Sequence, residues 1–221
     1  MYEAKDPTNR GRIAIVLIRL WLAAELLERA TSLLAISALG GLGGDIATDP
    51  QLHLADLLTE WTAACSLGMF AVTGIAVLRW ISLTNRNAHT WSDQVDITPG
   101  WAIGWFFVPF ASLFKPFEGV SATWRATVAP ADIPRVPVPS ILRWWWGLWL
   151  AMNFSGYLPT AFLADAAKPE QLIAARWTSI ATIGFDIPLA VVLVRIIARL
   201  SAMQRALLTQ CAGTIDEENA S

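Results

Sequence analysis

Residues 98–124 read TPGWAIGWFFVPFASLFKPFEGVSATW, and this stretch decides how the rest of the chain is arranged. It is apolar enough to enter a membrane, but Pro99, Pro109 and Pro116 interrupt it. A proline inside a helix removes one backbone donor and clashes with the carbonyl four residues earlier. Because freed backbone groups in hydrocarbon must be satisfied by protein or water, a straight lipid-facing helix is not expected. The stretch predicts a bent, protein-packed or interfacial segment.

Within this segment we predict a helix that starts at Pro99, bends at Pro109 and ends near Phe114, because Pro116 follows. One side of that helix is expected to carry Trp101, Trp105 and Val108, at i, i+4 and i+7. The chain then returns along the cytoplasmic boundary, so that Thr98 and Trp124 lie on the same membrane face.

The composition of the whole chain predicts an integral membrane protein. Of its 221 residues, 55% are hydrophobic and 15% are charged, whereas soluble domains carry about 25% charged residues. Apolar runs of about 20 residues or more predict transmembrane helices at about 13–40, 57–82, 141–163 and 171–200. The predicted fold is an all-α four-transmembrane-helix bundle, a single membrane domain over residues 13–209. The proline-broken re-entrant or interfacial segment, 98–127, lies between the second and third spans.

The distribution of Lys and Arg among the short connections predicts the orientation. Positive residues precede the first span, lie on both sides of segment 98–127 and follow the last span, whereas the other two connections hold only Lys168. This bias predicts that the N-terminus (1–12) and a disordered tail (210–221) are cytoplasmic. The alternative is a five-span protein with one terminus outside, in which an uninterrupted helix crosses at 98–124.

A signature lies between residues 79 and 124 and resembles that of a bacterial membrane-protein family known as a domain of unknown function. The shared pattern is P-G-W-A-x-G-W-x-x-x-P-x-A-[NS]-L-x-[KR]-P-[FY], with Ser112 where asparagine is usual. Its residues here are Arg79, Trp80, Asn85, Pro99, Gly100, Trp101, Trp105, Pro109, Ser112, Leu113, Lys115, Pro116 and Trp124. The resemblance implies a multi-span protein of the bacterial plasma membrane and no particular activity.

Charged residues inside the predicted spans are the candidate site, because a charge at the bilayer centre costs about 2.5–3.5 kcal/mol on insertion scales. Glu25 and Arg29 are four residues apart and face each other on a helix. At about 1.5 Å per residue, a set of similar depth comprises Glu28, Arg29, Glu60 and Arg176. Depth also predicts that Arg19 pairs with Asp186. Such networks either fix helix register or form a proton or ion pathway.

Other motifs leave the function open. No metalloprotease, nucleophile-elbow or phosphate-loop motif is present, Cys65 and Cys211 lack motif spacing, and His53 and His89 are expected in loops on opposite sides. The net charge of −2 does not favour nucleic acid. We therefore expect no cofactor or metal. The leading interpretation is a membrane-embedded interaction or assembly module, ahead of a lipid-binding or solute- or ion-conducting protein and a membrane enzyme. Expected partners are membrane lipids, a membrane or cytoplasmic protein, or a second copy.

The twelve tryptophans have two interpretations, because many of them fall near the predicted cytoplasmic boundary. They can form an interfacial belt, where the ring is apolar and its N–H stays wet, or line a site for a lipid or another amphiphile.

Overall fold

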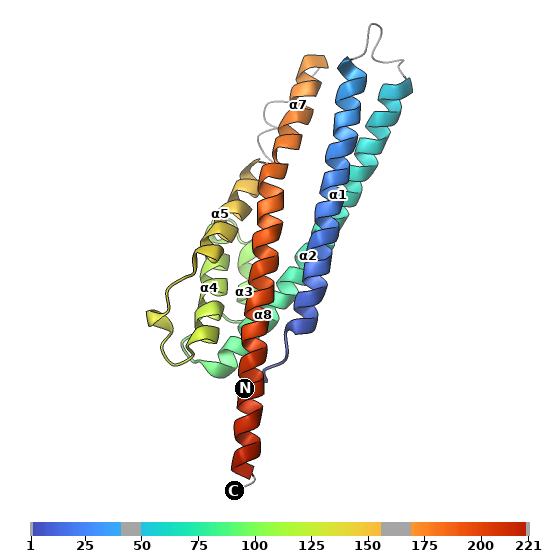
Figure 1. The fold of residues 1–221 in the computed structure, drawn as a ribbon. Coiled ribbons are helices and arrows are strands. Elements are labelled where there is room, and N and C mark those ends of the chain that lie inside the picture. Colours follow the sequence, from blue (N-terminus) through green and yellow to red (C-terminus); the bar gives the residue numbers. More distant parts are fainter. Residues whose placement is uncertain (1, 41–49, 156–168, 220–221) are drawn as a thin grey trace. The chain divides into compact units, whose positions relative to one another are not determined.

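A computed structural model of the protein describes residues 2–40, 50–155 and 169–219. Its regular structure in these residues is helical, without strands, so the all-α class is confirmed (Figure 1). The helices are α1 (Thr8–Gly40), α2 (Pro50–Trp91), α3 (Trp101–Gly104), α4 (Lys115–Val128), α5 (Ser140–Ser155), α7 (Pro169–Ala181) and α8 (Ile183–Asn219).

Two stretches of the described residues, Pro50–Trp91 and Ile173–Cys211, are long and apolar enough to cross a membrane. They correspond to the predicted second and fourth spans. The predicted first span falls on α1, which carries six charged residues along its length, four of them inside that span. The predicted third span, 141–163, extends beyond the described part of the chain. Two membrane-crossing helices are thus supported by length and composition, and four remain a prediction.

The long helices extend past the predicted boundaries. α2 has 42 residues and continues to Trp91, through a region that the sequence predicted to be a polar loop. His89, predicted in that loop, lies on this helix, and its Nε2 is 2.9 Å from the Ile97 carbonyl. His53 also lies on α2, near its start, and is exposed. At about 1.5 Å per residue, α2 is about 63 Å long, about twice the thickness of a bilayer's hydrocarbon core. α8 is helical to Asn219, across the predicted disordered tail.

The described chain divides into two compact units, and the single membrane domain over residues 13–209 stays a prediction. Unit 1 comprises Met1–Val16, Gly74–Trp146 and Val192–Ser221, and unit 2 comprises Leu17–Thr73 and Gly147–Val191. Every residue of the family signature lies in unit 1, since all of them fall between positions 79 and 124.

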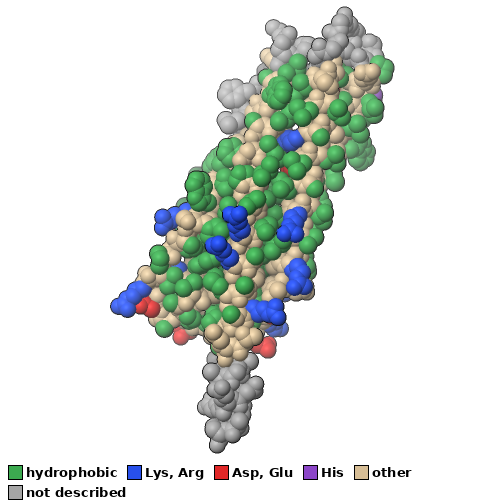
Figure 2. Space-filling view, viewed as in Figure 1, with side chains coloured by type: hydrophobic (Ala, Val, Ile, Leu, Met, Phe, Trp, Pro, Cys, Tyr) green, Lys and Arg blue, Asp and Glu red, His purple; other side chains and the backbone are tan. Residues whose placement is uncertain are grey.

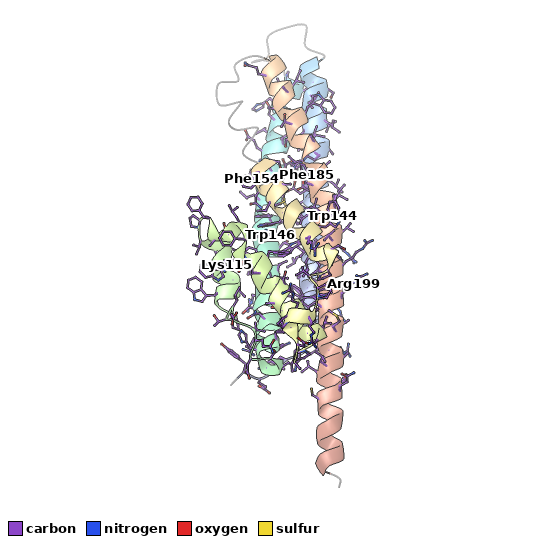
Figure 3. All side chains as sticks on the ribbon, turned by 90° about the vertical axis from the view of Figure 1, so that its left-hand side faces the viewer. Lys115, Trp144, Trp146, Phe154, Phe185 and Arg199 are labelled. Atoms are coloured by element: carbon purple, nitrogen blue, oxygen red, sulfur yellow. The ribbon has the colours of Figure 1, made fainter. Side chains whose placement is uncertain are left out.

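Unit 1 buries much of its tryptophan. Trp80, Trp124, Trp145 and Trp146 are each no more than 8% exposed, so they are core residues of this unit. Two of the four indole N–H groups donate to acceptors inside the unit: Trp80 to Ser201 Oγ at 3.0 Å and Trp146 to the Leu113 carbonyl at 3.0 Å. Figure 3 shows Trp146 beside the chain that leads to Lys115, whereas Trp144 points away from it.

The proline-broken segment is built from short pieces. A short helix, α3, begins at Trp101 with Gly100 as its N-cap, two residues after the predicted start at Pro99. The Trp101 and Trp105 rings stack at 4.4 Å, as their spacing predicted. The helix ends early, in a 3-10 turn at Trp105–Phe107, and Val108 is extended (φ −93°, ψ 117°). The predicted continuation through Pro109 is wrong, because a residue before proline is biased away from helical geometry. The five-span alternative lacks the uninterrupted helix that it needs.

A strained turn follows at the tip of this segment. Phe110 has φ 63° and ψ −48°, and the Ala111 N–H donates to the Pro109 carbonyl at 2.7 Å, which defines a γ-turn of the rare positive-φ form. The Phe110 ring is 82% exposed and Phe107 73%, so the tip is apolar as well as strained.

Pro116 opens a helix instead of ending one, contrary to the sequence prediction. It lies in the first turn of α4, where a missing N–H costs nothing. One face of α4 packs into unit 1, because Val120, Trp124 and Thr127 recur at helical spacing and are buried. Lys115 and Glu118 form an ion pair of 2.6 Å in the first turn.

A buried polar cluster joins four parts of unit 1. Gln204 of α8 is completely buried and donates to the Thr84 carbonyl and to Thr127 Oγ1 at 3.0 and 3.1 Å. Its own carbonyl accepts from Asn87 Nδ2 at 2.9 Å. Asn87 in turn bonds the backbone of Lys5, at 2.9 Å from the Lys5 N–H and 2.7 Å to the Lys5 carbonyl. The cluster thereby fixes α8, α2, α4 and the N-terminal segment in one register.

Candidate functional site

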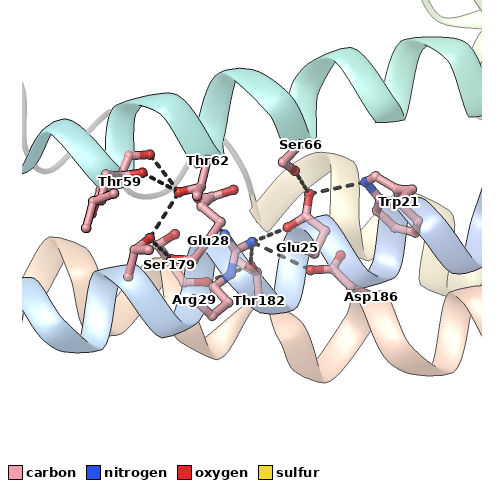
Figure 4. A network of polar contacts seen from close by, with 12 residues as sticks. Trp21, Glu25, Glu28, Arg29, Thr59, Thr62, Ser66, Ser179, Thr182 and Asp186 are labelled. Carbon is pink, nitrogen blue, oxygen red and sulfur yellow. Dashed lines mark hydrogen bonds and ion pairs between the residues drawn. The ribbon is translucent and has the colours of Figure 1, made fainter. Parts of the chain in front are cut away.

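The candidate site is a cluster of three carboxylates around one arginine in unit 2 (Figure 4). Arg29 on α1 contacts Glu25 and Glu28 of the same helix at 2.7 and 2.6 Å, and Asp186 of α8 at 3.7 Å. All four side chains are no more than 16% exposed. The predicted contact between Glu25 and Arg29, four residues apart, is confirmed.

The three carboxylates differ in their hydrogen bonds. Glu25 accepts from Trp21 Nε1 at 3.2 Å and from the Ser66 hydroxyl, in addition to Arg29. Asp186, with 4% of its side chain exposed, receives no hydrogen bond from a described residue and has only its ion pair with Arg29. Asp186 is therefore the least compensated carboxylate of the cluster.

Arg29 also reaches a break between two helices. Its Nη2 donates to Thr182 Oγ1 at 3.1 Å, and Thr182 lies between the end of α7 and the start of α8. Pro188 follows within α8, where it leaves the Gly184 carbonyl without its helical donor. The cluster thus combines buried charge with a locally interrupted backbone.

The predicted pairing of Arg19 with Asp186 is wrong. Arg29 holds Asp186, while Arg19 is exposed and makes no ion pair within the described residues. The depth estimate failed because Asp186 lies beside a helix break, which displaces it relative to a straight-helix count. A helix position also includes an azimuth, and depth alone does not decide which residues face each other.

The predicted grouping of Glu28, Arg29, Glu60 and Arg176 is half right. The structure brings Glu28 and Arg29 together, but Arg176 of α7 pairs with Asp56 of α2. Glu60 is exposed on α2 and has no ion pair or hydrogen bond with a described residue. Asp56 is one helical turn before Glu60, so the sequence argument found the right helix and missed the residue by one turn.

Several site residues carry no motif signal. Trp21, Ser66 and Thr182 complete the cluster, and only their position at helical spacing from charged residues could have indicated them. In unit 1, the signature residue Asn85 is fully buried and donates to Thr123 Oγ1 at 3.1 Å, whereas Ser112 is only partly buried. The signature thus marks residues that build unit 1, while the charge cluster lies outside it.

The helices, their apolar surfaces and the buried charges define a helical protein with two candidate membrane-spanning helices. A family model described as "Domain of unknown function (DUF4328)" matches residues 46–202, and the chain belongs to this family. No curated protein and no solved structure matches the chain. Within the described residues, no group of three or more His, Cys, Asp or Glu side chains is arranged to hold a metal ion.

Proposed function

We propose that the chain is a multi-span protein of the bacterial plasma membrane that serves as a membrane-embedded interaction or assembly module. The observation that carries this proposal is the uncovered surface of α2. In the most apolar window of this helix only 17% of the residues are buried by the rest of the chain. Large apolar side chains are correspondingly exposed over the surface drawn in Figure 2.

One stripe of α2 has the composition of a helix–helix contact. Glu60, Ala64, Gly68 and Ala71 are exposed and recur at i, i+4, i+8 and i+11. A Cβ added at Gly68 would have no heavy atom within 4 Å. Small residues let two membrane helices approach closely, and a polar side chain in lipid gains from a protein partner. We infer that this stripe packs against a partner helix, and a second copy of the chain is the simplest candidate.

Disulfide trapping tests this contact. With Cys65 and Cys211 replaced by serine, Ala64→Cys should form a crosslinked dimer in native membranes under mild oxidation. Leu27→Cys on α1 is the matched control, because Leu27 is 57% exposed but lies off the stripe, and it should crosslink at least tenfold less. Adding Gly68→Leu should abolish the Ala64→Cys product by keeping the backbones apart. Equal crosslinking at both positions would mean random collision and would refute the contact.

The proposed orientation, with both termini in the cytoplasm, rests on the Lys and Arg bias. Single cysteines at positions 45 and 168 should react with impermeant reagents from outside intact cells, and cysteines at positions 135 and 221 should react only after lysis. Labelling at position 135 from outside would overturn this orientation. Position 135 suits this test because the Arg135 side chain is 88% exposed, so burial within the protein would not explain a failure to react.

A second candidate function, conduction of protons or ions, is favoured by the cluster around Arg29. Three carboxylates face one guanidinium, so the cluster gains from additional positive charge, and the interrupted backbone near Thr182 offers carbonyl acceptors. Proton flux in proteoliposomes that Asp186→Asn abolishes would favour this candidate over an assembly role. The lipid-binding alternative is supported by a different surface, which lies in unit 1.

A further inference from the structure

A groove of about 480 Å³ runs between the start of α1 and the second half of α8, entirely within unit 1. Arg12 and Ile15 line it from α1, and Ala202, Arg205 and Ala206 line it from α8. The groove therefore combines an apolar lining with two guanidinium groups.

The two helices meet closely below this groove because residue 11 is glycine. Gly11 is buried, and a Cβ there would lie 2.7 Å from Ser201 Oγ and 3.2 Å from Ile197 Cγ2. The small residues of α8 leave the space above that contact unfilled. The floor is thus formed by a tight helix–helix contact, which gives the groove a fixed shape.

The charge around the groove is strongly positive. Arg12 and Arg205 line it, and Arg195 and Arg199 are exposed on the adjoining turns of α8. Figure 2 shows Lys and Arg side chains gathered over this part of the surface, and Figure 3 shows Arg199 projecting from α8. Among the described residues, Asp6 lies 3.9 Å from Arg205 Nε, and both Arg205 and Arg12 act electrostatically on its carboxylate. One carboxylate does not neutralise the four guanidinium groups.

Arg12 adjoins apolar surface on α1. Ile13 and Val16, which flank Arg12 and Ile15 on α1, are 49% and 48% exposed. A cation beside exposed apolar residues is typical of the level where hydrocarbon meets headgroups. A soluble anion would gain nothing from that apolar surface, whereas a lipid would use both parts.

We propose that this groove binds the headgroup of an anionic phospholipid, with the phosphate held by Arg12 and Arg205 and the start of an acyl chain against Ile15 and Ala202. The planar guanidinium forms paired hydrogen bonds with phosphate oxygens and is less strongly hydrated than an ammonium group. This inference goes beyond the assembly role and is independent of the α2 stripe, since it concerns unit 1.

The test measures lipid binding to the full chain in detergent by native mass spectrometry. Dioleoyl phosphatidylglycerol should bind at least tenfold more tightly than dioleoyl phosphatidylcholine. The variant Arg12→Gln/Arg205→Gln should lose at least tenfold of that affinity. The control variant Arg135→Gln/Arg143→Gln removes the same charge from two exposed arginines of unit 1 outside the groove, and it should bind as the unaltered chain does.

A second variant separates the groove from general charge attraction. Ala202→Phe fills the groove without changing any charge, and it should weaken phosphatidylglycerol binding by a similar factor. Unchanged binding by Ala202→Phe, or equal losses in the two double variants, would overturn the proposal. Glycerol phosphate added at the same concentration should not compete. Competition at that concentration would mean a site for soluble phosphate and would also overturn it.

Discussion

Arg29→Ala should destabilise unit 2 by about 3–5 kcal/mol, the cost of leaving buried charge without its partner. The substitution removes the one guanidinium that contacts Glu25, Glu28 and Asp186, and it also removes a hydrogen bond to Thr182. The measurement is reversible unfolding in mixed micelles, followed by a probe attached to unit 2. Arg19→Ala is the control: Arg19 is exposed and unpaired within the described residues, so its loss should cost less than about 0.5 kcal/mol.

A double-mutant cycle then distinguishes a coupled cluster from independent contacts. Glu25→Gln combined with Arg29→Gln should cost much less than the sum of the two single changes. The main cost of each single change is the buried charge that it leaves without a partner. Additive losses would show that the contacts seen around Arg29 do not couple. A loss for Arg19→Ala as large as for Arg29→Ala would instead restore the sequence-based pairing with Asp186.

Gln204→Leu should destabilise unit 1 by about 3 kcal/mol or more, the second large effect that the structure predicts. Leucine is close in size to glutamine but leaves Asn87 Nδ2, the Thr84 carbonyl and Thr127 Oγ1 without their Gln204 contacts. Each of these three buried groups loses one hydrogen bond, which is worth about 1 kcal/mol net and more where a buried donor or acceptor stays unsatisfied. The readout is the unfolding midpoint of unit 1 followed by its buried tryptophans.

Gln94→Leu provides the matched control in the same unit. Gln94 is exposed, and its side chain makes one bond, from Nε2 to the Ala131 carbonyl at 3.2 Å. Its replacement should change stability by less than about 0.5 kcal/mol. Comparable losses at positions 94 and 204 would contradict the importance assigned to the buried cluster.

The sequence predicted the helical class and the family, because apolar runs and the signature are local properties of the chain. It also predicted the contact between Glu25 and Arg29, since residues four apart share a helix face. It did not predict Gln204, although Ile197, Leu200 and Gln204 recur at helical spacing and are all buried. A single glutamine beyond the end of a predicted span is expected to be exposed to solvent. Only the tertiary contacts of Gln204 with α2 and α4 explain its burial.

The errors near prolines and in the charge pairs have different physical causes. Pro116 was expected to end a helix, but proline is equally compatible with a first helical turn, so its position alone does not distinguish start from end. Arg19 was assigned to Asp186 by depth, whereas the break at Thr182 and the azimuth of each side chain decide the actual partner. Local patterns define elements, and the pairing between elements depends on geometry that no local pattern contains.

The net free energy of the γ-turn at Phe110 depends on whether the Phe110 ring lies in water or in an apolar phase. The backbone strain of a non-glycine residue at positive φ is of the order of 1–3 kcal/mol. Moving an exposed phenylalanine ring from water into an apolar phase recovers about 1.5–3 kcal/mol, a quantity of the same size. The two terms cancel only where the ring leaves water. The conformation of residue 110 is therefore coupled thermodynamically to the phase around it, and a change of solvent changes the free energy of the turn itself.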